Sequence, residues 1–600
     1  MQKAFTMTSN LATANPARIP EEVGGIQYNF CKNASCTQFG VPASQHKSRG
    51  GNTYNLTGGN KGAGNIPSLR CNACGEHFPL KSNAAIAHEI ERISGYLNLA
   101  QLHVCCLDPQ CTNFGVSVQT PKAYRVHGKS ASGAKRYLCR CGKTVSVAKP
   151  TQWQRDTHHN TDIFKLLVNK MPLSRIVHVL GISWEVLYNR IDFIHSQCLA
   201  FAAHRESKLS EMSIPRLYLS VDRQEYAVNW SARKDKRNVI LSAVASSCNH
   251  TGYVFGMHLN FDASVDKQAA ERAAALAGDA ALSPAFRSYA RLWLDIDYAE
   301  SVKKSHYKKA AGSLNQSISN TYDLMEQRAD VESFDEKDKT HMLPQMGAQV
   351  HGQYTMIAHF HFLKQLLGNS VEKWRLFLDQ DSGIRSACIS AFVDEIKDKT
   401  MEAFYVRVQK GLTVDQKRQI KAQSQKVFDQ FKKANPGVSD NDIKILMLCD
   451  EINKVQQIGN YKDRWVHHPL PDMSESNKAM CWLTEHNDFD LTHKAWLYNK
   501  ASMHSVDNFF QKVRRRIAML ERPIHSSSTS GRTWNGYGAY NPDMVVKLLE
   551  IFRVVHNYID VSKHTTQVAG VAQTTKSTPA TRLGLAQAPL DYKDVLYFQP

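Results

Sequence analysis

Apolar residues recur along the chain with two different spacings, and these divide it into helical and strand-forming regions. Between residues 162 and 197 they recur three and four positions apart, which predicts amphipathic helices. From residue 215 the pattern becomes alternating, and the segments 215–228, 236–248 and 252–261 predict three strands joined by short polar turns. A helical region followed by an antiparallel meander indicates more than one domain.

The second half of the chain combines long polar helical segments with short apolar elements. A polar segment, 262–352, precedes an apolar helix at 354–368 and a strand at 374–381. A second polar helical segment, 386–463, precedes another strand at 479–484. We interpret the two polar segments as helical insertions into a single α/β domain.

Length and charge narrow the class of protein. At 600 residues the chain is too long for one core, so we expect a multidomain α/β protein. Lys and Arg number 74 against 55 Asp and Glu, a net charge of +19 that favours a polyanionic partner such as nucleic acid. No apolar run reaches the roughly 18–20 residues of a membrane span, and the first residues lack an apolar signal core. We therefore expect a cytoplasmic protein with no membrane partner.

Cysteines are concentrated near the N-terminus, where their spacing repeats. The sequence CTQFGV begins at the second cysteine of one Cys-x4-Cys pair, and CTNFGV begins at the second cysteine of the other. Each pair is followed by a second, closer pair of cysteines. This pattern predicts two tandem zinc ribbons, each holding one structural Zn²⁺ through four thiolates. The predicted zinc ligands are Cys31, Cys36, Cys71 and Cys74 in the first ribbon, and Cys106, Cys111, Cys139 and Cys141 in the second. Cys105 remains an alternative to Cys106, and His77 an alternative to one thiolate of the first ribbon.

The helical region after the ribbons has the features of a helix-turn-helix. Gly181 lies nine residues after Pro172, where a short turn would separate two helices, and Ser183 is a suitable N-cap. The second helix, 183–195, would then enter a major groove of DNA. Its outward-facing candidates are Trp184, Glu185, Tyr188, Asn189 and Arg190. A plain helical hairpin is the alternative.

Several aspartates occupy positions that are unusual for acids. Asp222 lies inside the first strand of the meander, where an acid beside a core requires a cation or a hydrogen-bond network. Asp379 and Asp381 end the strand at 374–381, where a solvated turn is the simpler explanation.

Four segments together resemble the DDE/D transposases of bacterial insertion sequences. DQDSG (379–383) resembles the turn around their second acid, with Asp381 where Gly is usual. SMHSVDNFFQKVRRRIAMLERPI (502–524) resembles the helix of their third acid, and WNGYGAYNPDMVVKLLEIFRVVHNYI with TPATRLGLAQAPLDYKDVLYF resembles their C-terminal segments. The likeness covers about 26–260, 353–385 and 480–597. It implies a ribonuclease-H-like α/β core with a mixed five-stranded sheet.

The resemblance also assigns roles to individual residues. Asp222, Asp379 and Asp507 would be the catalytic acids and would bind Mg²⁺ or Mn²⁺, with Asp507 where Glu is more usual. Asp381 is the alternative second acid, and Glu521, on the same predicted helix as Asp507, the alternative third.

Other residues are weaker candidates for the site. Asp295 and Asp297 rank lower as second acids, His359 and His361 are typical of packing, and His467, His468 and Glu475 could border the site. The run Arg514, Arg515 and Arg516 could contact DNA phosphates or form a solvated face.

The function implied is binding of the terminal repeats of a mobile element, followed by metal-dependent cleavage and joining to target DNA. Double-stranded DNA would be the partner, the protein would be a homo-oligomer on it, and it would be associated with a bacterial nucleoid. One alternative is a regulator or domesticated derivative that binds DNA without cutting it. Another is a nuclease that cuts without joining.

We divide the chain accordingly. The expected parts are a flexible tail (1–25), the first ribbon (26–100), the second ribbon (101–150), the helix-turn-helix region (151–212), the catalytic core (213–525, with insertions near 262–352 and 386–463), and a C-terminal helix and tail (526–600).

Overall fold

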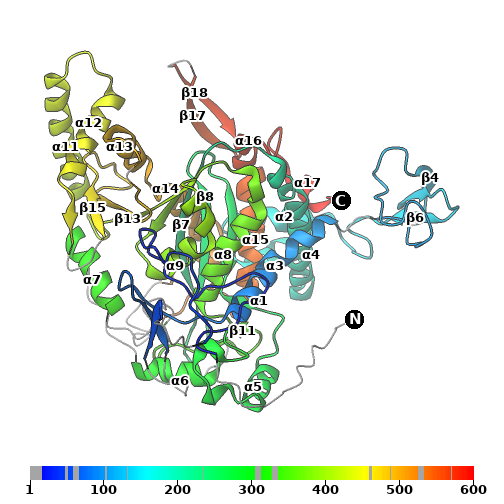
Figure 1. Ribbon diagram of the computed structural model, residues 1–600. Helices are drawn as coiled ribbons and strands as arrows, with labels where there is room; N and C mark the ends of the chain where they lie inside the picture. The colour runs from blue at the N-terminus through cyan, green and yellow to red at the C-terminus, as the bar shows by residue number, and fades with distance from the viewer. Residues whose placement is uncertain are drawn as a thin grey trace.

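An eight-stranded mixed sheet forms the centre of the protein (Figure 1). The computed structural model describes residues 17–46, 52–58, 66–101, 104–131, 133–230, 232, 234–304, 313–326, 336–458, 463–486, 488–523, 533–568 and 571–599. In spatial order the strands are β14 (Gln456–Gln457), β15 (Arg464–His467), β16 (Lys478–Trp482), β13 (Met401–Val408), β12 (Trp374–Asp379), β7 (Leu217–Val228), β8 (Val239–Cys248) and β9 (Val254–Leu259).

Strand direction changes across this sheet. Strands β7, β8 and β9 pair antiparallel, as the alternating pattern predicts, whereas β12 lies parallel to β7 and β13 parallel to β12. Strand β16 returns antiparallel to β13. In the β7–β12 register Val221 lies opposite Leu378, so Asp222 and Asp379 occupy the next position of their neighbouring strands.

The prediction that 386–463 is a helical insertion is wrong near the start of this segment. Residues Met401–Val408 form β13, which pairs with β12 on one side and β16 on the other. A short apolar run buried on both faces has no alternation, so periodicity alone cannot separate a strand of this kind from a buried helix. The helices of this segment are α9 (Ser382–Ala391), α10 (Val393–Lys397), α11 (Val414–Ala434) and α12 (Asp440–Asn453).

The other insertion is mostly helix and loop. It begins with β10 (Phe261–Asp262), which pairs with β11 (Ala348–Gln349), so the two ends of the insertion lie together. Its helices are α5 (Lys267–Leu276), α6 (Asp295–Lys304) and α7 (Leu314–Glu326). Helix α8 (Gly352–Leu367) follows as predicted and packs against β8, β9 and α9.

The first cysteine-rich module packs against the body, and part of the predicted tail before it packs with the module. Residues 1–16 of the predicted tail lie outside the described residues, whereas Ile19 is buried and Arg18 donates to the carbonyl of Tyr54 at 2.8 Å. The module contains β1 (Tyr54–Thr57), β2 (Ser68–Cys71) and β3 (His77–Pro79). Helix α1 (Asn83–Ser94) leaves it and packs against α8, with its buried Glu89 paired to Arg92 and Arg291.

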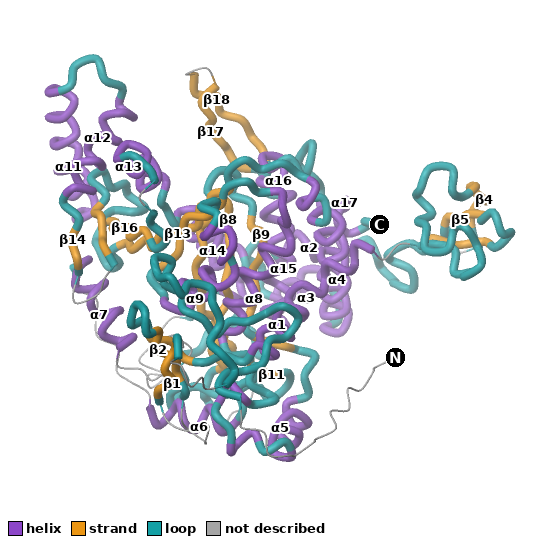
Figure 2. Tube along the Cα trace, in the orientation of Figure 1, coloured by secondary structure: helices purple, strands orange, loops and turns teal. Residues whose placement is uncertain are grey.

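The second module, with β4 (Arg125–Lys129), β5 (Lys135–Leu138) and β6 (Thr144–Val147), projects from the body beside α4 (Figure 1). Figure 2 shows that loops make up most of it. Its described contacts with the C-terminal end include Gln599, whose side chain donates to the carbonyl of Ala148 at 3.0 Å.

Three helices follow, α2 (His159–Leu167), α3 (Leu173–Leu180) and α4 (Trp184–Glu206). Helix α4 is longer than the predicted 183–195, because its second half packs against α15 of the body. At its C-terminal end the buried Glu206 pairs with Arg553 and accepts hydrogen bonds from Tyr96 and Tyr253.

The C-terminal region contains the predicted helix and a hairpin that was not predicted. Helix α13 (Leu491–Lys500) and α14 (His504–Arg516) precede α15 (Pro542–Val554), which continues into one π-helical turn, Val555–Ile559. The hairpin, β17 (Ser562–Val568) and β18 (Val571–Ser577), extends away from the body before α16 (Pro579–Leu583) and α17 (Tyr592–Leu596) (Figure 1). In the part of the chain that the structure describes, we find no helix with the length and apolar character needed to cross a membrane.

Candidate functional site

The first module brings four cysteine thiols together. The Sγ atoms of Cys31 and Cys74 lie 3.5 Å apart and those of Cys36 and Cys71 3.8 Å apart, and all four fall within 4.8 Å of one another. Just after the Cys31–Cys36 pair, which we call the knuckle of this module, the backbone N–H of Gln38 donates to Cys36 Sγ at 3.4 Å. Four thiolates in this arrangement could hold a structural Zn²⁺.

The second module repeats this geometry. Cys106 and Cys141 Sγ lie 3.6 Å apart, and Cys111 and Cys139 Sγ 3.4 Å apart. Asn113 takes the place of Gln38, since its N–H donates to Cys111 Sγ at 3.4 Å. The second set could therefore hold a second structural Zn²⁺.

A tyrosine hydroxyl forms hydrogen bonds with the backbone of each knuckle, and the sequence pattern does not predict these bonds. The Tyr54 hydroxyl donates to the carbonyls of Gln38 and Val41 and accepts from Cys31 N–H. Tyr124 does the same in the second module, donating to the carbonyls of Asn113 and Val116 and accepting from Cys106 N–H. The two tyrosines lie 23 and 18 residues after the first cysteine of their module, which hides the repeat in the sequence.

Neither alternative ligand belongs to a thiol cluster. Cys105 forms a bridge with Ser117 at the position that Phe30 has opposite Pro42 in the first module, whereas Cys106 corresponds to Cys31. His77 Nε2 is instead hydrogen-bonded to the Thr57 hydroxyl at 2.8 Å.

The second module is strongly basic. Between residues 104 and 150 it carries eight Lys and Arg against a single acid, Asp108, which pairs with Lys143 at 3.0 Å. Most of these cations are exposed. A projecting surface of this charge is suited to a polyanion.

Helices α3 and α4 are separated by the short turn that the sequence predicts. Gly181 ends α3 in the left-handed region with φ of 64°, and the Ser183 hydroxyl caps α4 by accepting from Val186 N–H at 3.2 Å. Trp184 and Tyr188 stack on each other with ring centroids 6.0 Å apart, and both are more than 40% exposed. Glu185 and Asn189 are also exposed, so the N-terminal turns of α4 present one open face.

The prediction that Arg190 faces outward is wrong. Its residue is only 8% exposed, and its guanidinium donates to the backbone carbonyl of Arg155. The chain before α2 covers this side of α4, which the spacing within one helix does not reveal.

The three predicted acids come from three different elements and lie at one place on the sheet. Asp222 is on β7, Asp379 ends the adjacent parallel strand β12, and Asp507 is in the first turns of α14, which packs against β7 and β8. Burial raises the pKa of Asp222 well above its usual range, and the carboxylates of Asp379 and Asp507 raise it further. These effects indicate that the three carboxyl groups are close neighbours.

The pKa of Asp507 is also raised, by less than that of Asp222. Desolvation by surrounding protein atoms and the charge of Asp379 raise its pKa to about 6, while Lys410 and Arg514 oppose the shift. The three carboxylates do not converge on one point, because the thiol sets are the only groups of three or more such ligands within 4.8 Å that the described residues form. The carboxyl oxygens are nevertheless the donor type that Mg²⁺ prefers. The pKa values of Asp222 and Asp507 are raised first by burial and then by repulsion from neighbouring carboxylates, and a divalent cation would relieve that repulsion.

A set of buried hydrogen bonds fixes α14 beside the strand that carries Asp222. Ser220, two residues before Asp222 on β7, accepts from Val506 N–H at 3.1 Å. Ser505 accepts from the Ser247 hydroxyl at 2.7 Å and donates to the Cys248 carbonyl at 3.0 Å. Because Val506 directly precedes Asp507, these bonds determine where the third acid lies relative to the first.

Glu475 borders the site, as the sequence suggested. Its carboxylate accepts from Met503 N–H and the Ser502 hydroxyl, both at 2.7 Å, and pairs with Lys478 at 2.8 Å. The Glu475 carboxylate therefore caps the start of α14, because Met503 at the N-cap position has no side chain that can do so. His468 lies near it and is held neutral, because burial lowers its pKa to about 3.

Asp381 and Asp379 have different surroundings. Asp381 is the N-cap of α9 and accepts from Gly383 N–H at 2.8 Å and Ile384 N–H at 3.2 Å, with Arg223 3.4 Å away. Asp379 has a side chain that is 25% exposed, and Arg407 approaches it only to 3.9 Å. Asp379 is thus the acid of the pair that remains open to a ligand.

The predicted helix around the third acid ends earlier than expected. Helix α14 stops at Arg516, and Glu521 lies beyond a short 3₁₀ turn at Ala518–Leu520, paired with Lys170 at 2.8 Å. Placing Glu521 on the helix of Asp507 was therefore wrong.

The three arginines at the end of α14 have separate environments. Arg516 donates to the carbonyl of Val168 and pairs with Asp560, both within 2.7 Å, and so has a structural role. Burial lowers the pKa of Arg514, while the charges of Asp222 and Asp507 oppose that shift. Arg515 is exposed.

Other candidates from the sequence lie apart from the acids. His359 is buried with its Nδ1 2.9 Å from Nδ1 of His258, which fits the packing interpretation, and burial lowers the pKa of His361 to about 4. Asp297 pairs with Arg287, and Asp295 with Lys267.

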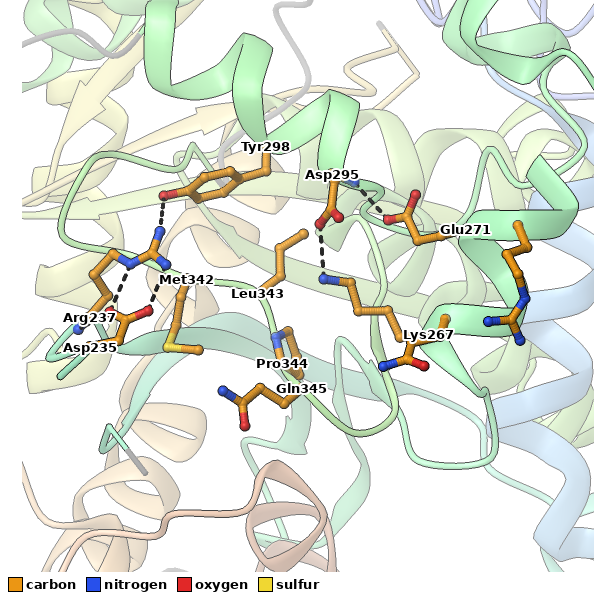
Figure 3. Close-up of a pocket in the computed structure, with 12 residues that line it drawn as sticks. Asp235, Arg237, Lys267, Glu271, Asp295, Tyr298, Met342, Leu343, Pro344 and Gln345 are labelled. Atoms are coloured by element: carbon orange, nitrogen blue, oxygen red, sulfur yellow. Dashed lines mark hydrogen bonds and ion pairs between the residues drawn. The ribbon is translucent and has the colours of Figure 1, made fainter. Parts of the chain in front are cut away.

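Asp295 lines a cavity of about 780 Å³ between α5, α6 and the loop that includes Met342 (Figure 3). Several of the charged groups on its wall pair with one another, as Arg237 does with Asp235 and Lys267 with Asp295.

Comparison with known proteins adds no assignment: no protein-family model matches the chain, and no curated protein matches its sequence.

Proposed function

We propose that the protein is a DNA transposase of a bacterial insertion sequence, which binds the ends of its element and cleaves and joins DNA strands. The observation that carries this proposal is the meeting of Asp222, Asp379 and Asp507. They come from two neighbouring parallel strands and a helix; burial raises the pKa of Asp222 and of Asp507, and the charge of Asp379 raises both further. Carboxylates brought together in this way serve metal-dependent phosphoryl transfer.

The sheet supports a ribonuclease-H-like core. Three antiparallel strands, β7 to β9, are followed by helix α8 and then by β12 and β13 parallel to β7. These five strands make the mixed sheet that the resemblance implies, and β14 to β16 extend it beyond β13.

In this proposal each group near the acids has a task. Asp222, Asp379 and Asp507 would supply oxygen ligands to Mg²⁺ or Mn²⁺, which when bound activates the attacking hydroxyl and stabilises the leaving oxygen of a phosphodiester. Arg514, whose pKa is affected by the charges of Asp222 and Asp507, would offset the charge of the DNA phosphate brought to them. Ser220, Ser505 and Glu475 would position α14 and thereby Asp507.

The N-terminal modules would bind the DNA ends. Trp184, Tyr188 and Asn189 are exposed at the start of α4, the part of a recognition helix that contacts bases. The basic second module would contact phosphates. By the same resemblance we expect a homo-oligomer on DNA, in the cytoplasm and associated with the nucleoid.

One observation favours the alternative of a DNA-binding regulator without catalysis. Among the described residues the three carboxylates do not come within 4.8 Å of one another, and the helix-turn-helix and ribbons would bind DNA without them.

Incubation with a DNA fragment carrying the end of the encoding element, with Mg²⁺ or with a chelator, separates the alternatives. We expect nicked and joined products with Mg²⁺ and neither with the chelator. Binding without cleavage would identify a regulator, and cleavage without joining would identify a nuclease.

A further inference from the structure

Lys410 lies just beyond the end of β13, the strand beside the one that ends in Asp379. It follows β13 by two residues, and β13 pairs in parallel with β12, where Asp379 lies opposite Val406. Lys410 is exposed, and no ion pair to it is found in the described part of the chain.

The chain runs from Lys410 directly into α11, a helix with a basic outer face. Lys421, Lys426 and Lys433 are exposed on it without ion pairs among the described residues, whereas Lys432 pairs with Asp440. The apolar side of α11, which includes Phe428 and Phe431, packs against α12 instead. Lys426 and Lys433 therefore face solvent on the outer side of α11, whereas Lys421, two turns before Phe428, is exposed on the side of the helix that borders a cleft.

The two helices of this hairpin have opposite charge. Helix α11 carries six Lys and Arg against two Asp, while α12 carries one Lys against four Asp and Glu. A polyanion approaching the hairpin would be attracted to α11 and repelled by α12, so the charge pattern favours one path for it.

A cleft of about 540 Å³ leads from this helix back toward the acids. Lys421 and Phe428 of α11 line one end, and Glu475 and Ser502, at the start of the helix that carries Asp507, line the other. Lys444 of α12 also lines it and has no ion pair among the described residues, whereas Lys478 is neutralised by Glu475.

The hairpin stands opposite the basic second module (Figure 1). In Figure 1 α11 and α12 lie at one side of the molecule, α2 to α4 and the second ribbon lie at the other, and β7 and α14 lie between them. DNA held at both sides would therefore cross the acids.

We propose that Lys410 and the outer face of α11 form a second DNA-binding surface, which holds the phosphate backbone on the side of the three acids opposite the helix-turn-helix. This inference rests on the proposed function, because it takes DNA as the substrate of the acids. Its ligand is the duplex phosphate backbone, read without sequence preference.

Salt dependence of DNA binding tests the proposal in the full-length protein. The test variant is Lys421→Gln, Lys426→Gln and Lys433→Gln combined, and the matched control replaces three other exposed lysines, Lys208, Lys339 and Lys373, with Gln. The probe is a DNA duplex of mixed sequence that is longer than the greatest dimension of the protein. Thermal unfolding of both variants checks that they fold.

The α11 variant should lower the slope of log affinity against log salt concentration by about 2–3, since each lost phosphate contact removes about 0.9. The control should keep the slope of the wild type. Lys410→Gln alone should lower the slope by about 1.

Two results would overturn the proposal, and they differ in what else they affect. If the wild type binds DNA with a steep salt slope and the α11 variant matches it, the second surface does not exist, while the proposed function stands. If the wild type shows no salt-dependent binding, the proposed function fails and this inference fails with it.

Discussion

Asp379 and Asp381 lie two residues apart, but the structure gives them separate tasks. Asp381 caps α9 and faces Arg223, so Asp381→Ala should lower the free energy of unfolding by about 1–2 kcal/mol, the range for a lost cap. Asp379→Asn should not destabilise the metal-free protein, because it removes repulsion with Asp222.

Thermal unfolding with and without Mg²⁺ measures both effects. Mg²⁺ should still raise the Tm of Asp381→Ala and should no longer raise that of Asp379→Asn. The reverse pattern would make Asp381 the ligand.

The raised pKa of Asp507 predicts a pH dependence of stability and of metal binding. An unfolded Asp ionises near pH 4 and this one near pH 6, so in this window the folded state binds more protons and stability falls as pH rises. Above about pH 6 both states are ionised and this contribution is constant. Because Mg²⁺ binds the ionised carboxylate, it should raise Tm more at about pH 7.5 than at about pH 5.

Asp507→Asn provides the control. Its own stability should lack the contribution of this carboxyl group between about pH 4 and pH 6. An equal Mg²⁺ effect at both pH values in the wild type would contradict the assignment of Asp507 as a ligand.

At the scale of elements, adjacent cysteines offer a matched test of the ribbons. Cys106 belongs to the second thiol cluster, whereas Cys105 forms only a backbone bridge beside it. Elemental analysis should find two Zn²⁺ per chain in the wild type and in Cys105→Ser, and one in Cys106→Ser. Loss of zinc from Cys105→Ser alone would show that the clusters are wrongly assigned.

The helix-turn-helix offers a second comparison. Replacing Trp184 and Tyr188 with Ala should weaken DNA binding by about 1–3 kcal/mol, the range for lost base contacts, and leave Tm unchanged because both rings are exposed. Arg190→Ala should instead lower Tm, because its guanidinium is buried and bonded to the Arg155 carbonyl. Binding titrations and thermal unfolding distinguish these effects; loss of binding confined to Arg190→Ala would place the DNA contact elsewhere.

The elements that sequence predicted well are those with a local signal. Alternation located β7 to β9, and repeated spacing located the two thiol clusters. Strand β13 was not predicted because a strand buried on both faces has no alternation. The burial of Arg190 was not predicted because the chain that covers it comes from before α2. The end of α14 at Arg516 carries no Gly or Pro signal, so the helix was extended too far.

At the scale of the whole molecule, β7 and α14, which carry Asp222 and Asp507, lie between α11 on one side and α2 to α4 with the second module on the other (Figure 1). The sequence shows that the protein is basic, but only the fold shows that the basic helix α11 and the basic second module lie at opposite sides of these elements. Side-chain contacts also distinguish the candidate acids, since Asp381 caps a helix and Asp297 and Glu521 form ion pairs. Such contacts join residues far apart in the chain, and no local pattern reports them.

The central claim is that Asp222, Asp379 and Asp507 together catalyse cleavage and joining of DNA. The most direct measurement follows both reactions on the element's own end with Mg²⁺, for the wild type and for the Asp→Asn variant of each acid, with Asp381→Asn as the matched control. The account predicts that the three variants bind the DNA but neither cut nor join it, while Asp381→Asn does both. Cleavage by any of the three at the rate of the wild type, or a wild type that binds the end and never cuts, would contradict it.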